Sequence, residues 1–281
     1  MPEPKDSRTN GFVKRFLTKA LKYSAVALAF AATGYYFPLV LLALFICGFW
    51  DVSRNRGLDR SVLKQYFLKN GIGTWFASPL NILMDILALP YTNKGVYQLA
   101  DLPLDYQTEI NSLINLADDG DLTARLERYM AGASRAMMFF KWYGRNVESP
   151  IEMPGFHSDF KFVRTIGVSA FKERERTSRH FGPFRPSLRV LYCLNDDVAE
   201  DAFIRVGTVE NHWRDKRLFI FDDTLLHQSF NETDAPRYCL FVDIIRPSYL
   251  PFIFDFAVSL IRVLFKGING VFYKNWKLVN H

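Results

Sequence analysis

The stretch from residue 218 to residue 245, LFIFDDTLLHQSFNETDAPRYCLFVDII, holds two apolar, β-forming runs joined by a polar, turn-rich segment. These runs, Leu218 to Phe221 and Tyr238 to Ile245, are typical of buried strands. Three similar runs precede them, at Phe162 to Phe171, Leu188 to Leu194 and Phe203 to Val209. Turn-forming residues separate the runs, among them Gly182-Pro183, Asn195-Asp196-Asp197 and Asn231 to Pro236. Closely spaced short strands of this kind predict an antiparallel sandwich or jelly roll of about 90 residues.

Helical patterns lie on both sides of the strands. From Tyr106 to Ala117 the apolar residues Ile110, Leu113 and Ile114 recur on one helical face. Helices before and after the strands make the expected fold class α+β. We expect five parts: a basic segment 1–22, a membrane segment 23–50, a helical and membrane-interface region 51–150, the jelly-roll core 151–247 and an amphipathic, membrane-associated helix within 248–281.

The 28 residues from Tyr23 to Trp50 carry no charge. A transmembrane helix needs about 20 apolar residues, so this segment can cross a bilayer. Pro38 can instead divide it into two shorter helices, which suits a re-entrant hairpin with both basic flanks cytoplasmic. A cleaved signal peptide is disfavoured, because the hydrophobicity continues well beyond the possible cleavage site at Ala29-Phe30-Ala31. Basic residues flank both ends, so the positive-inside rule does not choose an orientation.

Two later segments have the composition of membrane-interface helices. Residues 75–89, WFASPLNILMDILAL, carry one charge, Asp85, although a buried helix explains them equally well. From Pro251 to Lys266 the polar residues form a narrow stripe at helical spacing, made of Asp255, Ser259, Arg262 and Lys266. Such a helix can lie in a headgroup layer, with ordinary packing on the domain as the alternative.

The amino-acid composition favours some classes of binding partner over others. The chain has 281 residues, of which 26 are Phe, 13 Tyr and 5 Trp, and a net charge of +6. This balance favours an anionic partner such as a phospholipid surface, and the aromatic content suits a membrane interface. Nucleic-acid binding gains little support, because no recognition motif is present. With only 3 cysteines, the chain is no disulfide scaffold, which indicates a reducing compartment.

Two of the five histidines, His180 and His227, lie at the ends of predicted strands. Neutral imidazoles on two strands of a β-sandwich can hold one metal ion, and nearby arginines can bind a carboxylate. The spacing alone is a weak signal, since two such histidines are more often unrelated polar residues.

The residues around these histidines form a more specific pattern. Its elements are, in chain order, Phe76-x-x-Pro79-x-Asn81, Lys141-Trp142-Tyr143, His180-x-Gly182-Pro183, Ser187-Leu188-Arg189, Phe221-Asp222-Asp223, His227, Arg237, Phe241-Val242-Asp243 and Arg246-Pro247. Over residues 75–247 this order and spacing resembles the aspartyl/asparaginyl β-hydroxylase family, and most closely its lipid A 2-hydroxylase branch. The resemblance implies a dioxygenase with a double-stranded β-helix, a cupin-like jelly roll, that uses Fe(II), 2-oxoglutarate and O2.

The resemblance also assigns roles to individual residues. It implies that His180 and His227 are the metal ligands. It implies that Arg237 pairs with the far carboxylate of 2-oxoglutarate and that Arg189 contacts the carboxylate at the metal end. Ser169 matches a position that supports this co-substrate in the peptide-hydroxylating branch. Arginine suits a dicarboxylate because its planar fork binds carboxylates in bidentate fashion.

Three departures from the family pattern leave alternatives open. Gly182 stands where the lipid A branch has an aspartate that completes the metal triad, although the peptide-hydroxylating branch also has glycine there. Lys172 to Arg176 replace a Pro-Gly turn, and Leu191 replaces a further histidine. A peptidyl aspartyl/asparaginyl β-hydroxylase and a non-catalytic, membrane-bound lipid-binding relative are the alternatives.

A basic cluster surrounds the first histidine. We expect part of it to receive a lipid headgroup, with a solvated charged loop as the alternative; its arginines are Arg174, Arg176, Arg179 and Arg185. Asp222 and Asp223 precede His227 closely enough to orient its ring, or to form a turn. The sequence as a whole favours an iron-dependent hydroxylase of a membrane lipid acyl chain, of the lipid A or aminolipid type. The resemblance implies a bacterial inner-membrane location with the catalytic domain facing the cytoplasm.

Overall fold

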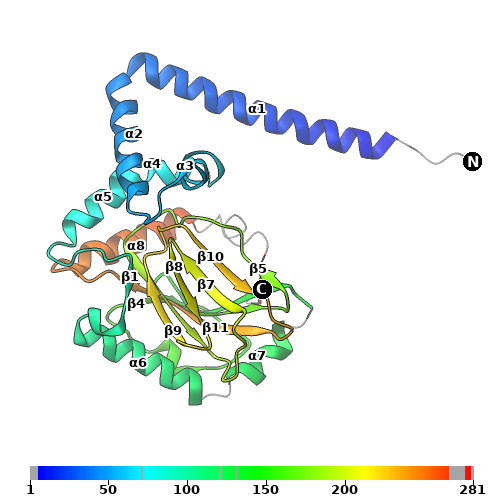
Figure 1. Ribbon diagram of the computed structural model, residues 1–281, viewed down its shortest axis with the longest axis vertical. Helices are drawn as coiled ribbons and strands as arrows, with labels where there is room; N and C mark the ends of the chain where they lie inside the picture. The colour runs from blue at the N-terminus through cyan, green and yellow to red at the C-terminus, as the bar shows by residue number, and fades with distance from the viewer. Residues whose placement is uncertain (1–5, 71, 120–121, 131, 266–275, 280–281) are drawn as a thin grey trace, which may run out of the picture.

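Two sheets, antiparallel except for one short parallel pairing of two strands, form the centre of the molecule (Figure 1). The computed structural model describes residues 6–70, 72–119, 122–130, 132–265 and 276–279. Its strands are β1 (Val96–Tyr97), β2 (Arg135–Trp142), β3 (Arg145–Asn146), β4 (Val163–Phe171), β5 (Glu175–Arg176), β6 (Ser187–Cys193), β7 (Ala202–Val206), β8 (Val209–His212), β9 (Leu218–Phe221), β10 (His227–Asn231), β11 (Arg237–Ile245) and β12 (Lys277–Leu278). The larger sheet has the order β1-β9-β6-β11-β4-β2-β12, with β3 paired to β2, and the smaller has the order β5-β10-β7-β8.

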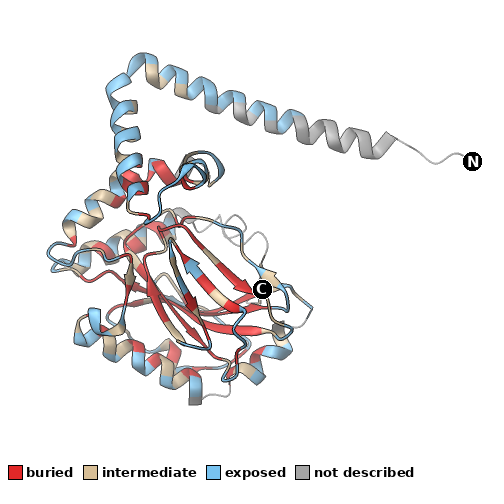
Figure 2. Ribbon diagram, in the orientation of Figure 1, coloured by how far each residue is buried: buried red, intermediate tan, exposed pale blue. Residues whose placement is uncertain are grey.

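The alternation of side chains along β11 explains how the two sheets and the helices share one core. Cys239 and Phe241 point into the space between the sheets, where they join Leu191 of β6 and Ile204 of β7. The residues between them, such as Leu240, point to the other face and pack with the helices. Because both faces of β11 are covered, all of its residues are buried (Figure 2).

Four of the five predicted strand runs correspond to β4, β6, β9 and β11, within a mixed α+β fold. The fifth, Phe203 to Val209, is divided by a turn after Val206 into β7 and the start of β8. The sheet also extends N-terminally beyond residue 151, where the jelly-roll core was expected to begin. β2 pairs along most of its length with β4, from Arg135 opposite Phe171 to Lys141 opposite Ile166. Its sequence, RAMMFFKW, is apolar on both faces, so it lacks the alternation that marks a strand with one exposed face.

Most of the described helices pack on or next to the sheets, while α1 extends away from them (Figure 1). They are α1 (Asp6–Tyr36), α2 (Pro38–Ser53), α3 (Arg60–Lys64), a π-helical turn (Gln65–Lys69), α4 (Ile72–Phe76), α5 (Ser78–Leu87), α6 (Leu104–Asp119), α7 (Leu122–Met130) and α8 (Pro251–Phe265), with 3-10 turns at Leu99–Asp101 and Pro154–His157. α6 buries Tyr106, Ile110 and Leu113 in the core that covers the outer face of the large sheet. The apolar residues that recur at helical spacing in the segment 106–117 therefore lie on the buried face of α6.

The N-terminal apolar segment is two helices rather than one. Pro38 occupies the first turn of α2, and Phe37 before it has a non-helical backbone. Ala27–Tyr36 and Pro38–Ser53 meet at an angle of 116° and reach the length and composition of a membrane span only when taken together. No single helix in the described part of the chain does so alone. The proline thus divides the segment where the sequence predicted.

The next helices, α3 to α5, connect this segment to the sheets. Asp59 caps α3 by accepting a hydrogen bond from the Val62 backbone N–H. Tyr66 and Trp75 form a small apolar cluster with Val52 of α2 and with Phe181, which follows His180. Packing of α3 to α5 therefore supports the loop that carries the first histidine.

At the other end of the chain, α8 packs on the large sheet through Phe254 and Val258. It is the helix expected within residues 248–281, and residues 266–275 and 280–281 of that part lie outside the described residues.

Candidate active site

The two predicted metal ligands lie side by side at the edge of the small sheet. His227 begins β10. His180 follows β5 and forms an isolated β-bridge with His227. The His180 N–H donates to the His227 carbonyl at 3.1 Å, and the His227 N–H donates to the His180 carbonyl at 2.9 Å. Their ring centroids are 4.2 Å apart. Strand pairing thus brings together two histidines that are distant in sequence.

Backbone carbonyls orient both imidazoles in the same way. His180 Nδ1 lies 2.7 Å from the Ser178 oxygen, and His227 Nδ1 lies 2.8 Å from the Leu225 oxygen. A carbonyl can only accept, so each Nδ1 carries the proton and each Nε2 keeps its lone pair for a metal ion. Burial lowers the pKa of both rings, and the neighbouring His180 lowers that of His227 further. The neutral imidazoles that a metal site requires are therefore the favoured form.

Asp223 occupies the space beside Gly182, the second residue after His180. A Cβ built on Gly182 would come within 2.7 Å of the Asp223 carboxyl carbon. Burial raises the pKa of Asp223 to about 7, against the lowering effect of Arg189. No group of three or more His, Cys, Asp or Glu with metal-binding geometry occurs among the described residues. The possible role of Asp222 and Asp223 in orienting His227 is not observed, because the Leu225 carbonyl does this.

Arg237 is a buried cation for which the described residues provide no anionic partner. It is 2% exposed and lies over the rings of Phe171 and Trp213, at 4.2 and 5.6 Å from their centroids. Within the described part of the chain, its Nε and Nη1 atoms have no hydrogen-bond partner. A buried guanidinium left without an acceptor is costly, so this geometry fits an anionic ligand that completes it.

One cavity contains the histidines and this arginine. Its volume is about 490 Å³, and His180, His227, Asp223, Arg237 and Ser169 all line it. Ser169 lies opposite Cys239 in the β4–β11 pairing, and its hydroxyl donates to the Cys239 carbonyl at 3.4 Å. The structure therefore places Ser169 in the same cavity as the residues expected to bind the co-substrate.

Arg189 lines the cavity too, but it is already paired. Its Nε donates to Asp243 at 2.7 Å, and one Nη lies 3.2 Å from an oxygen of Asp223. It also lies over the Phe241 ring, at 4.0 Å from the centroid. These contacts fix the Asp223 carboxylate beside Gly182, which the sequence did not predict.

The four arginines expected at a lipid headgroup separate into two groups. Arg174, Arg176 and Arg179 are exposed. Arg174 pairs with Asp234 at 2.8 Å and Arg176 with Glu232 at 3.9 Å, while Arg179 contacts the Ser61 hydroxyl. Arg185, in contrast, is fully buried and its three nitrogens contact carboxylates. Arg185 is therefore not available to a headgroup, because the interior binds it.

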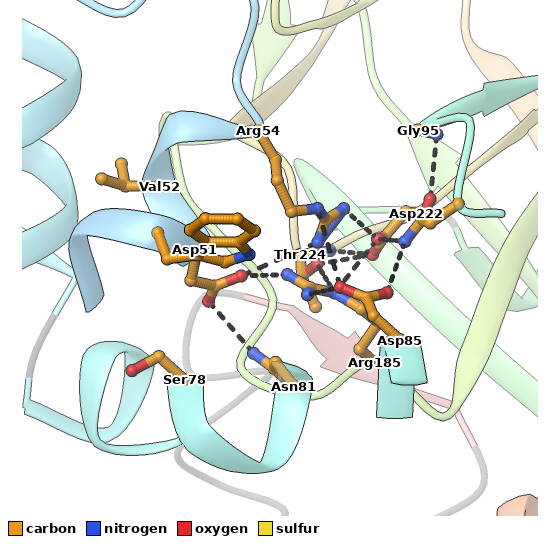
Figure 3. A network of polar contacts seen from close by, with 12 residues as sticks. Asp51, Val52, Arg54, Ser78, Asn81, Asp85, Gly95, Arg185, Asp222 and Thr224 are labelled. Atoms are coloured by element: carbon orange, nitrogen blue, oxygen red, sulfur yellow. Dashed lines mark hydrogen bonds and ion pairs between the residues drawn. The ribbon is translucent and has the colours of Figure 1, made fainter. Parts of the chain in front are cut away.

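Arg185 belongs to a buried ion network that joins the N-terminal helices to the sheets (Figure 3). The network contains three arginines and three aspartates: Arg54, Arg185, Arg246, Asp51, Asp85 and Asp222. Arg185 pairs with Asp51 of α2, while Arg54 donates to Asp222 at 2.6 Å. Thr224 and Asn93 also donate to Asp222, each at 2.6 Å. The network positions Asp222 and, next to it, Asp223.

Arg135 at the start of β2 is a cavity residue that the sequence did not indicate. It lines the cavity, and its guanidinium carbon lies 5.6 Å from the centre of the Trp276 ring. Its Nε is 3.6 Å from a Glu175 oxygen. Only recognition of β2 as part of the sheet, through its pairing with β4, would have placed it here.

Comparisons with known proteins bear on this site. The chain is 35% identical, over 94 residues, to the ornithine lipid ester-linked acyl 2-hydroxylase of Rhizobium tropici. The match covers 32% of this chain and 32% of that protein, so the chain spans about a third of the length of the curated relative it matches.

Similarity to solved structures is lower. A prolyl-4-hydroxylase of Pseudomonas putida shares 16% identity, with 29% of this chain and 50% of that chain covered and a TM-score of 0.25. A Cupin_2 domain of an Enterobacter cloacae transcriptional regulator shares 7% identity, with 39% and 95% covered and a TM-score of 0.27. The architecture of this chain is described by its own strand order. Residues 128–247, which carry both histidines, Arg189 and Arg237, match the aspartyl/asparaginyl β-hydroxylase family.

Proposed function

We propose that this protein is an Fe(II)- and 2-oxoglutarate-dependent dioxygenase that hydroxylates an acyl chain of a membrane lipid. The observation that carries the proposal is the buried guanidinium of Arg237, whose Nε and Nη1 find no hydrogen-bond partner among the described residues, in one cavity with two neutral, oriented imidazoles. The imidazoles suit a divalent metal ion, and the guanidinium suits one end of a dicarboxylate. We take the two facing sheets as the jelly roll of such an enzyme.

The residues of the chain divide the work. When bound, iron, O2 and 2-oxoglutarate supply the oxidising power for C–H hydroxylation, with succinate and CO2 as the other products. His180 and His227 hold the metal through Nε2, with their Nδ1 protons fixed on backbone carbonyls. Arg237 binds the far carboxylate of the co-substrate, and Ser169 lies beside it. Arg189 holds Asp223 beside the metal position, in the space that Gly182 leaves open.

Three observations support a lipid substrate. The relative from Rhizobium tropici is named for hydroxylation of an acyl chain of ornithine lipid. The cavity is lined partly by apolar and aromatic side chains, including Trp142, Tyr143, Phe184 and Ile261, which suit an acyl chain. The bent pair α1 and α2 fits a protein held at a membrane. We place the enzyme at a bacterial inner membrane with its sheets on the cytoplasmic side.

The test is oxygen-dependent succinate formation from 2-oxoglutarate by the detergent-purified protein with Fe(II) and total membrane lipid. We expect His180→Ala and His227→Ala to abolish it. His212→Ala is the matched control, because His212 also has its Nδ1 on a backbone carbonyl but lies on β8, outside the cavity lining. Mass spectrometry of the lipids should show one species that gains an oxygen atom. Oxygen gain by an Asp- or Asn-containing peptide instead would favour a peptidyl hydroxylase, and absence of Fe(II) binding would favour a non-catalytic relative.

A further inference from the structure

The helix α8 has the reverse of the polarity expected for a helix on a water-exposed surface. Its charged residues are bound to the domain: Asp255 accepts from Arg164, and Arg262 donates to the Tyr143 carbonyl at 2.7 Å. Its large apolar residues are exposed instead, with Phe252 at 67% and Phe256 at 68%. Both charges pair with the domain, although the Asp255 side chain stays 45% exposed. Aromatic rings turned toward water are unfavourable, unless the outer medium is apolar.

α5 has the same arrangement. Leu83 and Ile86 are exposed, whereas its only charge, Asp85, belongs to the buried ion network. The C-terminal end of α5 meets the N-terminal end of α8. The Ser248 hydroxyl donates to the Leu87 carbonyl at 3.0 Å, and the rings of Tyr91 and Tyr249 are 5.5 Å apart.

The two helices thus form one surface, which we call the apolar face. Its exposed side chains are Leu80, Leu83, Ile86, Leu89, Tyr249, Phe252, Phe256, Leu260 and Val263. A contiguous apolar surface of this kind marks an interaction site rather than ordinary protein surface.

Two features identify the occupant of the apolar face as an anionic bilayer. α5 packs along α2, so the face continues into the bent apolar pair. The segment from the end of α2 to the π-helical turn, which packs on α2 and α4 through Phe67, carries exposed cations, namely Arg56, Arg60, Lys64 and Lys69. None of them forms an ion pair with another residue in the described ranges. Cations next to apolar surface suit the headgroups and acyl region of an anionic membrane.

The inner side of α8 connects this face to the cavity. Ile261 lines the cavity, one residue before Arg262, which binds the Tyr143 carbonyl. Tyr143 lines the cavity as well. We infer that α5 and α8 dock on an anionic phospholipid bilayer, so that an acyl chain enters the cavity from the membrane past Ile261 and Tyr143 and reaches the histidines. This inference deepens the proposed function and rests on it for the identity of the substrate.

The test uses the full chain, reconstituted in nanodiscs of phosphatidylcholine and phosphatidylglycerol. A fluorophore sensitive to polarity is attached to a single introduced cysteine, at Phe256→Cys in α8 or Ile86→Cys in α5. The background carries Cys47→Ser, while Cys193 and Cys239 are buried. Arg214→Cys is the control, because Arg214 follows the C-terminal end of β8. The N-terminal helices lie near the other end of β8, where the preceding turn approaches Gly57.

We expect the labels at positions 256 and 86 to show a blue shift in nanodiscs and to lose emission when brominated lipids are added. The label at position 214 should show neither change. Equal, unquenched emission at all three positions would overturn the inference. A blue shift without quenching by brominated lipid would also overturn it, because a second protein would then cover the face. The readout needs neither iron nor turnover, so failure of docking and failure of the oxygenase proposal are separate results.

Discussion

The carboxylate of Asp223 lies in the space that a side chain on Gly182 would fill, 2.7 Å from the position of its Cβ. The two residues are joined by a hydrogen bond from the Gly182 N–H to the Asp223 carbonyl at 2.8 Å. Gly182 is two residues after His180, so a carboxylate from the loop before His227 stands beside the first histidine. The glycine that departs from the lipid A pattern is thus required by the aspartate next to it.

This relationship predicts the outcome of an exchange of the two residues. Gly182→Asp alone should weaken Fe(II) binding by about tenfold or more, because two carboxylates cannot share this space. Gly182→Asp combined with Asp223→Gly should recover the binding, since the clash is removed and a single carboxylate remains, now from the segment after His180. Anaerobic Fe(II) titration measures both. Gly182→Ala separates the steric effect from the charge, and wild-type affinity in Gly182→Asp would contradict the prediction.

Arg237 predicts opposite effects on stability with and without ligand. Arg237→Met removes a buried charge that lacks an acceptor, so the protein without 2-oxoglutarate should be as stable as the wild type or more so. The wild type should gain about 2.7 kcal/mol at a 2-oxoglutarate concentration of about 100 times Kd. The variant should lose most of this gain, since a hydrogen bond to a charged group contributes about 1.5–3 kcal/mol.

Thermal unfolding with and without 2-oxoglutarate, in anaerobic Fe(II), measures both effects. Arg214→Met is the matched control, because Arg214 is exposed and pairs with Glu200 at 3.3 Å. Full stabilisation of Arg237→Met by 2-oxoglutarate would show that another residue binds the far carboxylate.

Several strands could be predicted from the sequence, because an apolar run that ends at turn-forming residues is easily recognised. Phe162 to Phe171 and Tyr238 to Ile245 were found within one residue of β4 and β11. β2 was missed because it is apolar on both faces, like the buried segments of a helix. Arg135 was missed together with it.

The polar contacts between distant parts could not be predicted from the sequence. Asp51, Asp85 and Asp222 are far apart in the chain, and each one fits a turn or a helix surface when read alone. The helical period of α8 gave its polar stripe, but a period does not say which side faces the protein. The sequence also places Arg185 in a surface cluster, because its carboxylate partners are distant in the chain. In the structure it is the centre of the buried network.

The network predicts a pH-dependent loss of stability. Burial alone would raise the pKa of Asp222, but Arg54, Arg185 and Arg246 hold it well below its usual range. Its charged form therefore stabilises the fold at pH values above about 4, and this contribution disappears as the pH falls through the depressed folded pKa. Asp222→Asn should cost about 3–5 kcal/mol at pH 7, because it leaves two buried arginines, Arg185 and Arg246, and the half-buried Arg54 with two carboxylates.

Urea unfolding of wild type and Asp222→Asn between pH 7 and pH 3 tests this. The difference between them should be constant down to about pH 4 and then shrink. Asp234→Asn is the control: its surface pair with Arg174 is exposed, and its effect should stay below about 1 kcal/mol. A difference that grows toward low pH would contradict the assignment of the charged form to Asp222.

The exposed arginines before His180 predict an effect on binding without an effect on folding. Arg174 and Arg176 form surface pairs, so reversing both charges, by Arg174→Glu and Arg176→Glu, should change the free energy of unfolding by less than about 1 kcal/mol. If they contact an acidic headgroup, the reversal should raise KM for the lipid and leave kcat unchanged, because the headgroup contact is equal in ground and transition states. The increase in KM should shrink at high salt, since these charges are screened by water and ions.

Steady-state kinetics with the lipid in mixed micelles measures the change in KM. The control carries Arg205→Glu and Arg214→Glu, an equal charge change on β7 and on the turn after β8. An unchanged KM would make the cluster a solvated loop and leave headgroup binding to cations such as Arg135 inside the cavity.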